Sequence, residues 1–333
     1  MREPAFWWRP RGGIALTPVA AVYGAAAWLR LRATGQSVGA PIICLGNLTV
    51  GGAGKTPAAL AVARLLLAAH QRVFFLSRGY GGRLAGPVMV NPSVHGAAAV
   101  GDEPLLLAHL APTIVARDRL AGAHFARRAG ARIIVMDDGF QNPSLKKDLP
   151  ILVIDGRRGI GNGRIIPAGP LRAPLQSQIA RARALIVVGP GEAAEAVAEN
   201  ARRRGLEVFG SRLEPDRQTL AALGGRKILA FAGIADPNKF FATLDAAGLA
   251  VAERVSFADH HRYAAAQAQA LLDRAQQQNL MLLTTEKDHV RLTGDPPLAT
   301  LAARAAVLPV RLVIEQEDAF SELVMSVGMR QPG

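Results

Sequence analysis

A glycine-rich segment between an apolar run and a helical pattern is the sharpest chemical signal in the chain. It reads GNLTVGGAGKTP (46–57) and overlaps the end of the apolar run PIICLGN (41–47). Glycines let successive N–H groups turn toward phosphate oxygens, and a helix that begins near Lys55 adds the positive end of its dipole. The spacing matches G-x-x-x-x-G-K-[ST], except that Thr49 stands at the first position. We therefore predict a phosphate-binding loop made of Thr49, Val50, Gly51, Gly52, Ala53, Gly54, Lys55 and Thr56.

Two residues of this loop and an acidic pair later in the chain could handle a nucleotide. The Lys55 ammonium would contact the β- and γ-phosphates, and the Thr56 hydroxyl would bind Mg²⁺. A phosphate-binding loop also predicts an acidic residue at the end of a neighbouring strand, facing the metal. Asp137 and Asp138 stand at such a place in RIIVMDDGFQN (132–142), directly after an apolar run. We therefore expect Thr56, Asp137 and Asp138 to hold Mg²⁺.

The elements that must position these side chains follow from apolar runs that alternate with helical patterns. Runs that are apolar throughout predict strands buried on both faces. Such strands, alternating with helices, are typical of a parallel sheet. The predicted strands lie at 41–47, 72–77, 113–116, 132–137, 150–155 and 184–189, with a second set at 227–233, 279–285 and 305–310.

We predict an α/β fold with two domains, as the length of 333 residues suggests. A P-loop NTPase-type parallel sheet domain is expected over 36–222, and a second, smaller α/β domain over 223–333. The segment 211–226 carries polar residues, a proline and two glycines, so it is the candidate connection.

Composition and charge narrow the choice of partners. The 39 Lys and Arg outnumber the 26 Asp and Glu, which gives a net charge of +13. A hydrophobic content of 50% argues against intrinsic disorder, and the single cysteine, Cys44, excludes a disulfide scaffold. Because long basic runs, zinc-finger spacing and an aromatic-rich RNA-binding signature are all missing, we expect no nucleic-acid partner. An anionic membrane surface or an anionic substrate suits the charge better.

Residues 1–35 predict an N-terminal membrane-associating helix. Their arginines stand against Glu3 alone, and the stretch 12–29 between them holds no charge. That stretch is short for a bilayer span and contains Pro18, so we expect a helix in or near the membrane interface. The alternative is an ordinary core helix at the start of the domain. The arginines are Arg2, Arg9, Arg11, Arg30 and Arg32, and the aromatic residues suited to the headgroup level are Trp7, Trp8, Tyr23 and Trp28.

Seven segments taken in order resemble the tetraacyldisaccharide 4′-kinase family, the lipid A kinases. They are GNLTVGGAGKTP, SRGYGGR (77–83), GDEP (101–104), MDDGFQN (136–142), GNGRIIPAGPLRAP (161–174), FADHHRY (257–263) and TTEKDHVRL (284–292). The resemblance implies ATP- and Mg²⁺-dependent phosphorylation of the 4′-hydroxyl of an acylated glucosamine disaccharide 1-phosphate. It also implies an active site between the two domains and a location at the cytoplasmic face of the inner membrane of Gram-negative bacteria.

The resemblance further implies roles for residues that spacing alone does not pair. Asp102 would accept the hydroxyl proton with His260 beside it, and Lys55 would neutralise phosphate charge. Without the resemblance, the favoured interpretation of Asp102 is an N-cap for a helix that begins at Pro104, and His260 is interpreted as a surface loop residue. Arginines are suited to clamp the 1-phosphate and the sugar. The candidates are Arg78, Arg119 and Arg172, with Arg83 and Arg117 as further possibilities.

Three positions depart from the family pattern. Asn142 stands where the family usually has His, Lys147 where it has Arg, and Ala173 where it has Glu. The alanine removes an acceptor for a sugar hydroxyl, which puts a substrate-binding role for position 173 in doubt. In TTEKD, Glu286 and Lys287 could either contact the nucleotide or hold the domain interface.

Two other classes of function stay open at this point. One is a P-loop ATPase or GTPase of the partitioning or metallocentre-maturation type, in which GGxGKT also occurs. It predicts nucleotide-dependent dimerisation and no lipid phosphorylation. The other is a non-catalytic membrane-binding module, which would tolerate replacement of Asp102.

Overall fold

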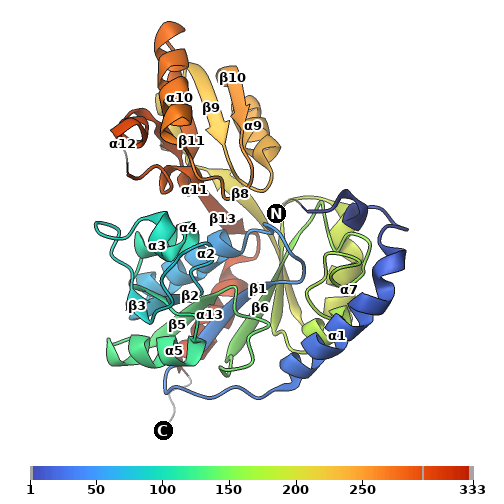
Figure 1. The fold of residues 1–333 in the computed structure, drawn as a ribbon. Helices are drawn as coiled ribbons and strands as arrows, with labels where there is room; N and C mark the ends of the chain where they lie inside the picture. Colours follow the sequence, from blue (N-terminus) through green and yellow to red (C-terminus); the bar gives the residue numbers. More distant parts are fainter. Residues whose placement is uncertain (1–2, 295, 330–333) are drawn as a thin grey trace.

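The computed structural model describes residues 3–294 and 296–329, which form two stacked α/β units (Figure 1). The larger unit is built on a nine-stranded sheet with the order β13-β8-β7-β6-β1-β5-β2-β4-β3. Its strands pair in parallel except for the two edge strands, β3 and β13, which are antiparallel to their neighbours. The strands are β1 (Ile42–Asn47), β2 (Val73–Ser77), β3 (Val88–Met89), β4 (Thr113–Val115), β5 (Ile133–Asp137), β6 (Leu149–Asp155), β7 (Ala184–Val188), β8 (Glu207–Pro215) and β13 (Val310–Ile314).

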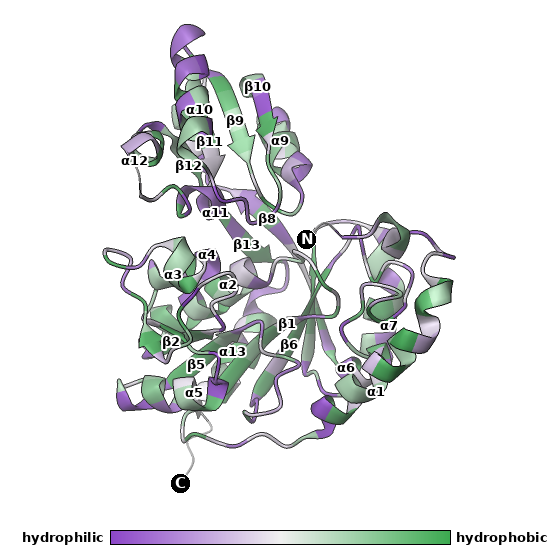
Figure 2. Ribbon diagram, viewed as in Figure 1, coloured by the Kyte–Doolittle hydropathy of each residue, from purple (hydrophilic) through white to green (hydrophobic). Residues whose placement is uncertain are grey.

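Helices cover both faces of this sheet, which is why its central strands are apolar on both sides (Figure 2). One core joins the sheet to α2 and α13, and the opposite core joins it to α1, α5, α6 and α7. The short helices α3 and α4 pack beside β4. The helices are α1 (Thr17–Arg32), α2 (Lys55–Ala68), α3 (Ala97–Val100), α4 (Asp102–Ala108), α5 (Arg119–Arg128), α6 (Leu175–Ile179), α7 (Glu195–Arg203) and α13 (Glu317–Met329).

The smaller unit has a four-stranded parallel sheet with the order β10-β9-β11-β12. Helices α10 and α12 cover one face, and α8 and α9 cover the other. The strands are β9 (Lys227–Ala232), β10 (Ala250–Ser256), β11 (Met281–Thr285) and β12 (Ala306–Leu308). The helices are α8 (Arg217–Leu223), α9 (Pro237–Ala246), α10 (Ala265–Gln277), α11 (Glu286–His289) and α12 (Pro296–Arg304).

All nine strands predicted from apolar runs are present, and the predicted α/β class is confirmed. Of the missed strands, β3 is only two residues long, and β8, β10 and β13 contain charged residues instead of unbroken apolar runs. In β10, for example, exposed and half-buried residues alternate as expected for a sheet edge. The predicted connection 211–226 is regular for most of its length, because β8 continues to Pro215 and α8 follows it.

The C-terminal residues lie elsewhere than the predicted division at 222/223 places them. β13 leaves the smaller unit and pairs antiparallel with β8, and α13 then packs against α2 on the larger sheet. The reason is burial: Phe320, Leu323, Val324 and Val327 of α13 fill the core under that sheet face. The smaller unit is thus an insertion between β8 and β13.

The predicted N-terminal helix is present as α1, with a short 3-10 turn before it. Its buried positions Ala20, Gly24, Ala27 and Leu31 recur every three or four residues and form one narrow face against the larger unit. Gly24 permits this packing, since a Cβ there would lie 2.9 Å from the Ile165 side chain. The rest of the helix is exposed, so it is not the ordinary core helix that the sequence left as an alternative.

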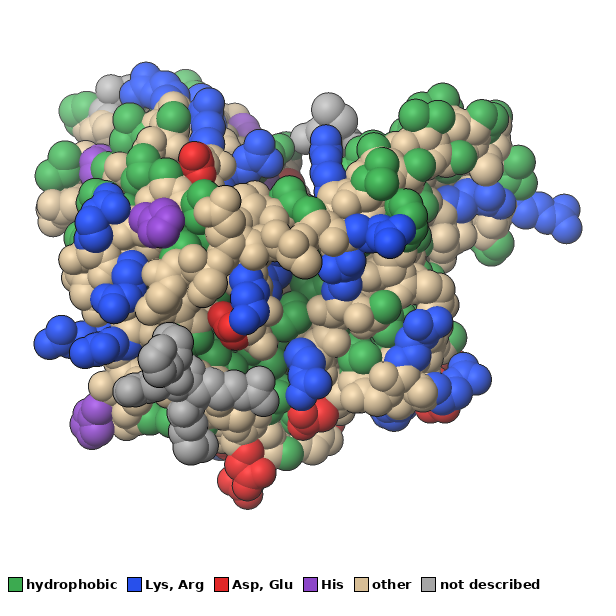
Figure 3. All heavy atoms as spheres, turned by 90° about the horizontal axis from the view of Figure 1, so that it is seen from below, with side chains coloured by type: hydrophobic (Ala, Val, Ile, Leu, Met, Phe, Trp, Pro, Cys, Tyr) green, Lys and Arg blue, Asp and Glu red, His purple; other side chains and the backbone are tan. Residues whose placement is uncertain are grey.

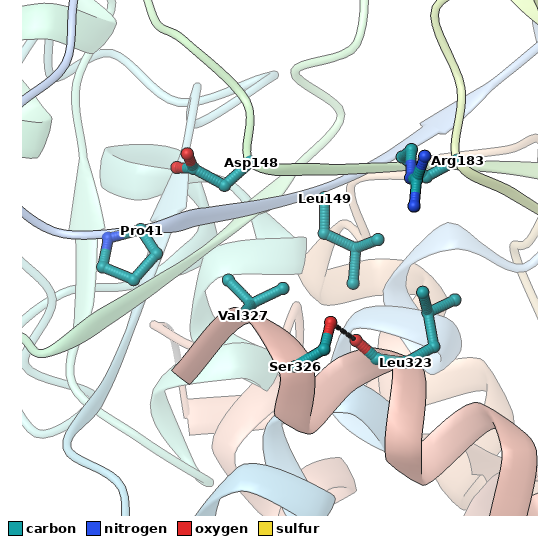
Figure 4. Close-up of a pocket in the computed structure, with 7 residues that line it drawn as sticks. All are labelled: Pro41, Asp148, Leu149, Arg183, Leu323, Ser326 and Val327. Carbon is teal, nitrogen blue, oxygen red and sulfur yellow. Dashed lines mark hydrogen bonds between the residues drawn. The ribbon is translucent and has the colours of Figure 1, made fainter. Parts of the chain in front are cut away.

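A small cavity of about 40 Å³ lies under α13 at the amino ends of β1, β6 and β7 (Figure 4). Pro41, Asp148, Leu149 and Arg183 line it from the sheet side. The volume suits one or two water molecules. This is the sheet edge opposite the loop that follows β1, so the cavity has no part in that loop's chemistry.

Replacing Phe320 with Ala should test the placement of the C-terminal helix. Phe320 is 1% exposed and meets the Phe209 ring edge-on, with 5.1 Å between ring centroids. The lost burial and the cavity left behind should lower the free energy of unfolding by about 3–5 kcal/mol, measured by denaturant titration. Val94→Ala, at a position that is 73% exposed, is the control. Equal stability of the two variants would contradict this packing.

Candidate active site

The predicted phosphate-binding loop joins β1 to α2 at the carboxyl edge of the larger sheet. Gly51 and Gly54 have φ values of +106° and +93°, which favour glycine. The Asn47 side-chain amide donates to the Gly51 carbonyl at 2.7 Å, and the Val50 N–H donates to the Pro170 carbonyl at 2.9 Å. The loop is therefore held open from both sides, and α2 begins directly at Lys55.

Strand pairing brings the acidic pair beside this loop. Leu45 of β1 pairs with Asp137 of β5, so the two strands end next to each other. The Lys55 ammonium lies 3.2 Å from the Asp138 carboxylate, and the Arg172 guanidinium lies 2.8 Å from it. Burial would raise the pKa of Asp138, but these two cations outweigh it and lower the pKa to about 2. Asp138 is thus an ionised partner both for Lys55 of the loop and for Arg172 beside the loop.

Asp137 has the opposite electrostatic situation. The Thr56 hydroxyl donates to one of its carboxylate oxygens at 3.2 Å, while the other oxygen is buried and has no hydrogen-bond partner among the described residues. Burial, reinforced by the Glu103 charge, raises the pKa of Asp137 to about 7. A buried carboxylate with an unpaired oxygen is a position where a cation is favourable. Thr56 and Asp137 therefore fit the predicted Mg²⁺ better than Asp138 does.

Asp102 and His260, which the sequence could not pair by spacing, meet between the two units. The His260 imidazole lies 3.0 Å from the Asp102 carboxylate, Nδ1 to Oδ2. Asp102 opens α4 in the larger unit, and His260 lies in a loop of the smaller one. Burial would raise the pKa of Asp102, but the His260 hydrogen bond and the Arg291 and Lys287 charges hold it well below its usual range. The hydrogen bond to Asp102 in turn raises the pKa of His260.

Two further cations of the smaller unit reach the same helix start. Lys287 lies 2.9 Å from Glu103, and the Arg291 Nε donates to Asp102 at 3.0 Å. The sequence left two roles open for Lys287, a contact with the nucleotide or a place at the domain interface, and in the structure Lys287 forms an ion pair between the two units. Arg291 was missed. The only signal for it was its place in TTEKDHVRL, because nothing in its type distinguishes it from the many other arginines.

The three arginines predicted for substrate differ in their surroundings. Arg78 is exposed in the glycine-rich loop after β2. Arg119 is buried and donates to the Ala116 carbonyl, and burial together with the Arg78 charge lowers its pKa to about 10. Arg172 donates to the Thr49 carbonyl at 3.1 Å as well as to Asp138, so it braces the phosphate-binding loop.

The residues at the three departures from the family pattern serve local structure. Asn142 accepts from the Ser144 hydroxyl at 2.6 Å, and Lys147 donates to the Asn142 carbonyl at 2.5 Å. The Ala173 side chain is completely buried beside Gln178, which donates to its carbonyl at 2.9 Å. In this chain the region around position 173 therefore closes over an apolar side chain.

The larger unit has a parallel sheet with a phosphate-binding loop, and the Asp102–His260 pair lies where this unit meets the smaller one. These features are those of a P-loop phosphotransferase. A family model described as tetraacyldisaccharide-1-P 4′-kinase matches residues 13–328. The chain belongs to this family and is a kinase, as the resemblance implied.

Relatives cover the full length of the chain. A tetraacyldisaccharide 4′-kinase of Bradyrhizobium sp. (strain BTAi1) is 51% identical over 100% of this chain and 98% of its own length. One from Rhodopseudomonas palustris (strain BisB18) is 54% identical over 96% of this chain and 93% of its own. A crystal structure of LpxK from Aquifex aeolicus in complex with ATP superposes with a TM-score of 0.73 at 27% identity, covering 95% of this chain and 99% of that one. These relatives do not support the partitioning or metallocentre-maturation reading.

Replacing His260 with Gln should change how stability depends on pH. The folded pKa of His260 lies above its usual value, so the protonated imidazole stabilises the folded state at low pH, and this is lost as pH rises. Wild type should exceed His260→Gln in stability below about pH 6, by about 1 kcal/mol or less because the ring is partly exposed. The difference should shrink toward pH 9 in thermal melts. His124→Gln, on an exposed residue of α5, is the control. A gap that widens with rising pH would contradict the pairing.

Proposed function

We propose that the chain transfers the γ-phosphate of ATP to the 4′-hydroxyl of a tetraacyldisaccharide 1-phosphate, a step of lipid A biosynthesis. The observation that carries the proposal is the Asp102–His260 pair, in which a carboxylate of the unit that holds the phosphate-binding loop meets an imidazole of the smaller unit. The family match supplies the acceptor, and the ATP-bound structure of the Aquifex aeolicus relative supports the donor.

The loop side of the site would bind and orient the nucleotide. The N–H groups of residues 51–54 would surround the phosphates, and Lys55 would move from Asp138 toward their negative charge. Arg172 would keep Asp138 in place when Lys55 leaves it. Thr56 and Asp137 would hold Mg²⁺, which neutralises charge on the phosphate oxygens when it is bound.

The acceptor side would handle the hydroxyl proton. Asp102 would accept it while the nucleophilic oxygen attacks in line, and His260 would orient the carboxylate through Nδ1. A carboxylate with a depressed pKa is a weak base, but a loose phosphoryl-transfer transition state demands position more than basicity. We assign to the exposed Arg78 the contact with the 1-phosphate. Arg119 and Arg172 would instead support the site through their hydrogen bonds to neighbouring backbone carbonyls.

We also propose that α1 attaches the enzyme to the cytoplasmic face of the inner membrane. Residues Ile14–Arg32 form a helix that is long and apolar enough to cross a bilayer, with only 17% of it buried. Val22 and Leu29 are 74% and 62% exposed, and Arg32 stacks on the Trp28 ring at 4.6 Å. An apolar face beside basic residues suits an anionic membrane interface.

The surrounding surface has matching charge. Seen from below, Lys and Arg side chains prevail over Asp and Glu, and hydrophobic side chains gather at the right, on the side that carries α1 (Figure 3). Of the aromatic residues predicted as anchors, Tyr23 and Trp28 are exposed. Trp7 is buried and donates to the Pro167 carbonyl at 2.9 Å, so it fixes the N-terminal segment to the domain instead. Arg2 lies outside the described residues.

Asp102→Asn should reduce turnover by at least about 10²-fold while ATP affinity stays within about twofold. The amide keeps the shape of the side chain but cannot accept the proton. The assay follows label from γ-labelled ATP into the disaccharide lipid, with equilibrium binding for ATP. The matched control is Asp273→Asn on the exposed face of α10, which should keep wild-type turnover. If Asp102→Asn keeps wild-type turnover, Asp102 does not accept the hydroxyl proton. If the wild-type enzyme binds ATP but transfers no label to the disaccharide lipid, the proposed reaction is wrong.

Val22→Glu combined with Leu29→Glu should weaken membrane attachment several-fold. Charges on the exposed face of α1 oppose burial in the interface, while the buried face that packs on the domain is unchanged. The measurement is recovery with sedimented vesicles that contain anionic phospholipid. Val94→Glu, equally exposed but distant in sequence from α1, is the control. Undiminished sedimentation of the double variant would show that another surface binds the membrane.

A further inference from the structure

One buried arginine of the smaller unit grips the Asp102 carboxylate. Arg291 follows α11, and its side chain is only 5% exposed. Its Nε donates to the Asp102 Oδ2 at 3.0 Å, and its Nη2 donates to the same oxygen. That oxygen also faces the His260 Nδ1, while the other carboxylate oxygen accepts from the Glu103 N–H at 3.0 Å. Both oxygens of Asp102 are thus fixed.

Arg291 is itself fixed from behind. Its Nη1 donates to the Gly233 carbonyl at 2.7 Å and to Asp288 at 3.0 Å. Asp288 is completely buried and accepts from the Tyr263 hydroxyl at 2.8 Å and from the Gly233 N–H at 2.9 Å. The Thr285 hydroxyl donates to its second oxygen at 2.6 Å. The acceptors of the guanidinium are therefore a backbone carbonyl and two carboxylates that accept further hydrogen bonds.

Arg291 makes more hydrogen bonds than the other ion-paired cations that join the two units. Lys287 and Glu103 form one ion pair across the same boundary, and Lys239 and Asp155 form another. Neither ion pair includes the Asp102 carboxylate or the His260 imidazole. Arg291, by contrast, donates to the very oxygen that His260 shares, and only a planar guanidinium can reach Asp102, Asp288 and Gly233 at once.

The charges that face this group explain its ionisation. Arg291, His260 and Lys287 act on Asp102 from the smaller unit, while Glu103 is its neighbour on α4 and Asp259 lies 3.8 Å from the far side of His260. Asp288 and Tyr263 face Arg291 on its other side. Without the guanidinium, a carboxylate as buried as Asp102 would hold its proton to higher pH.

We propose that Arg291 is a positioning residue for phosphoryl transfer: it keeps Asp102 ionised and oriented toward His260, and Asp288 and Tyr263 hold Arg291 for that purpose. The proposal rests on the proposed role of Asp102 as the group that receives the hydroxyl proton. It adds no bond-making step, since the proton still passes from the hydroxyl to the carboxylate.

The test compares Arg291→Met and Arg291→Lys with wild type in the full-length enzyme. We expect Arg291→Met to lower kcat at least tenfold, to leave the KM for ATP within twofold, and to move the acid limb of the kcat–pH profile upward by about one pH unit. Arg291→Lys should keep Asp102 ionised but lose the several hydrogen bonds of the guanidinium. Its acid limb should therefore return toward that of wild type while its kcat stays reduced. Lys239→Met, which removes another ion pair between the units, should keep the wild-type acid limb.

A double variant separates this proposal from the proposed function. If Arg291 acts through Asp102, Arg291→Met should cause little further loss of kcat in an Asp102→Asn background, whereas a merely structural role gives multiplied losses. Loss of activity in Asp102→Asn together with wild-type kcat and acid limb in Arg291→Met would overturn the positioning role and leave the kinase assignment standing. Should Arg291→Met fail to fold, Tyr263→Phe serves instead. It should shift the acid limb in the same direction by a smaller amount, and an unchanged profile would overturn the proposal.

Discussion

A carboxylate buried between two domains stays ionised only if charged partners are buried with it, and Asp102 imposes this requirement on the whole enzyme. Its partners come from the smaller unit: His260 from the loop after β10, and Arg291 from the segment after β11. Each partner must arrive at hydrogen-bonding distance, which fixes how the smaller unit sits over the larger sheet. Glu103 and Lys287 repeat the same requirement one residue further along α4.

On the other side of the site, buried carboxylates are again paired with partners, here through neighbouring strands of one sheet. Because β1 and β5 are neighbours in the sheet, Lys55 and Thr56 meet Asp138 and Asp137 without help from distant segments. This is why the loop and its acidic pair could be predicted from the sequence. An apolar run predicts each of these strands, and the carboxyl ends of parallel strands lie at the same edge of the sheet. The inner strands of both sheets were predictable for the same reason.

Features that depend on pairing between distant segments could not be predicted in this way. Charged residues interrupt the apolar pattern of β8 and β13, and only their antiparallel pairing shows that the C-terminus returns to the larger sheet. Asp102 and His260 are 158 positions apart, and it was the family resemblance, not spacing, that brought them together. Arg291 gave no signal of its own, because its importance lies in three acceptors that the fold collects around it.

The insertion of the smaller unit between β8 and β13 determines how the two units are connected. Pro215 and Val310 are direct partners in the ladder, so the chain leaves the larger sheet and re-enters it at adjacent points. Residues 216–309 are therefore joined to the larger unit through the adjacent ends of β8 and β13, and the larger sheet stays continuously hydrogen-bonded across this point. The order of strands in the larger sheet is therefore independent of the inserted residues. The two units are covalently joined only at these adjacent strand ends, whereas their contacts at Asp102 and at the two further ion pairs are made by side chains that the fold brings together.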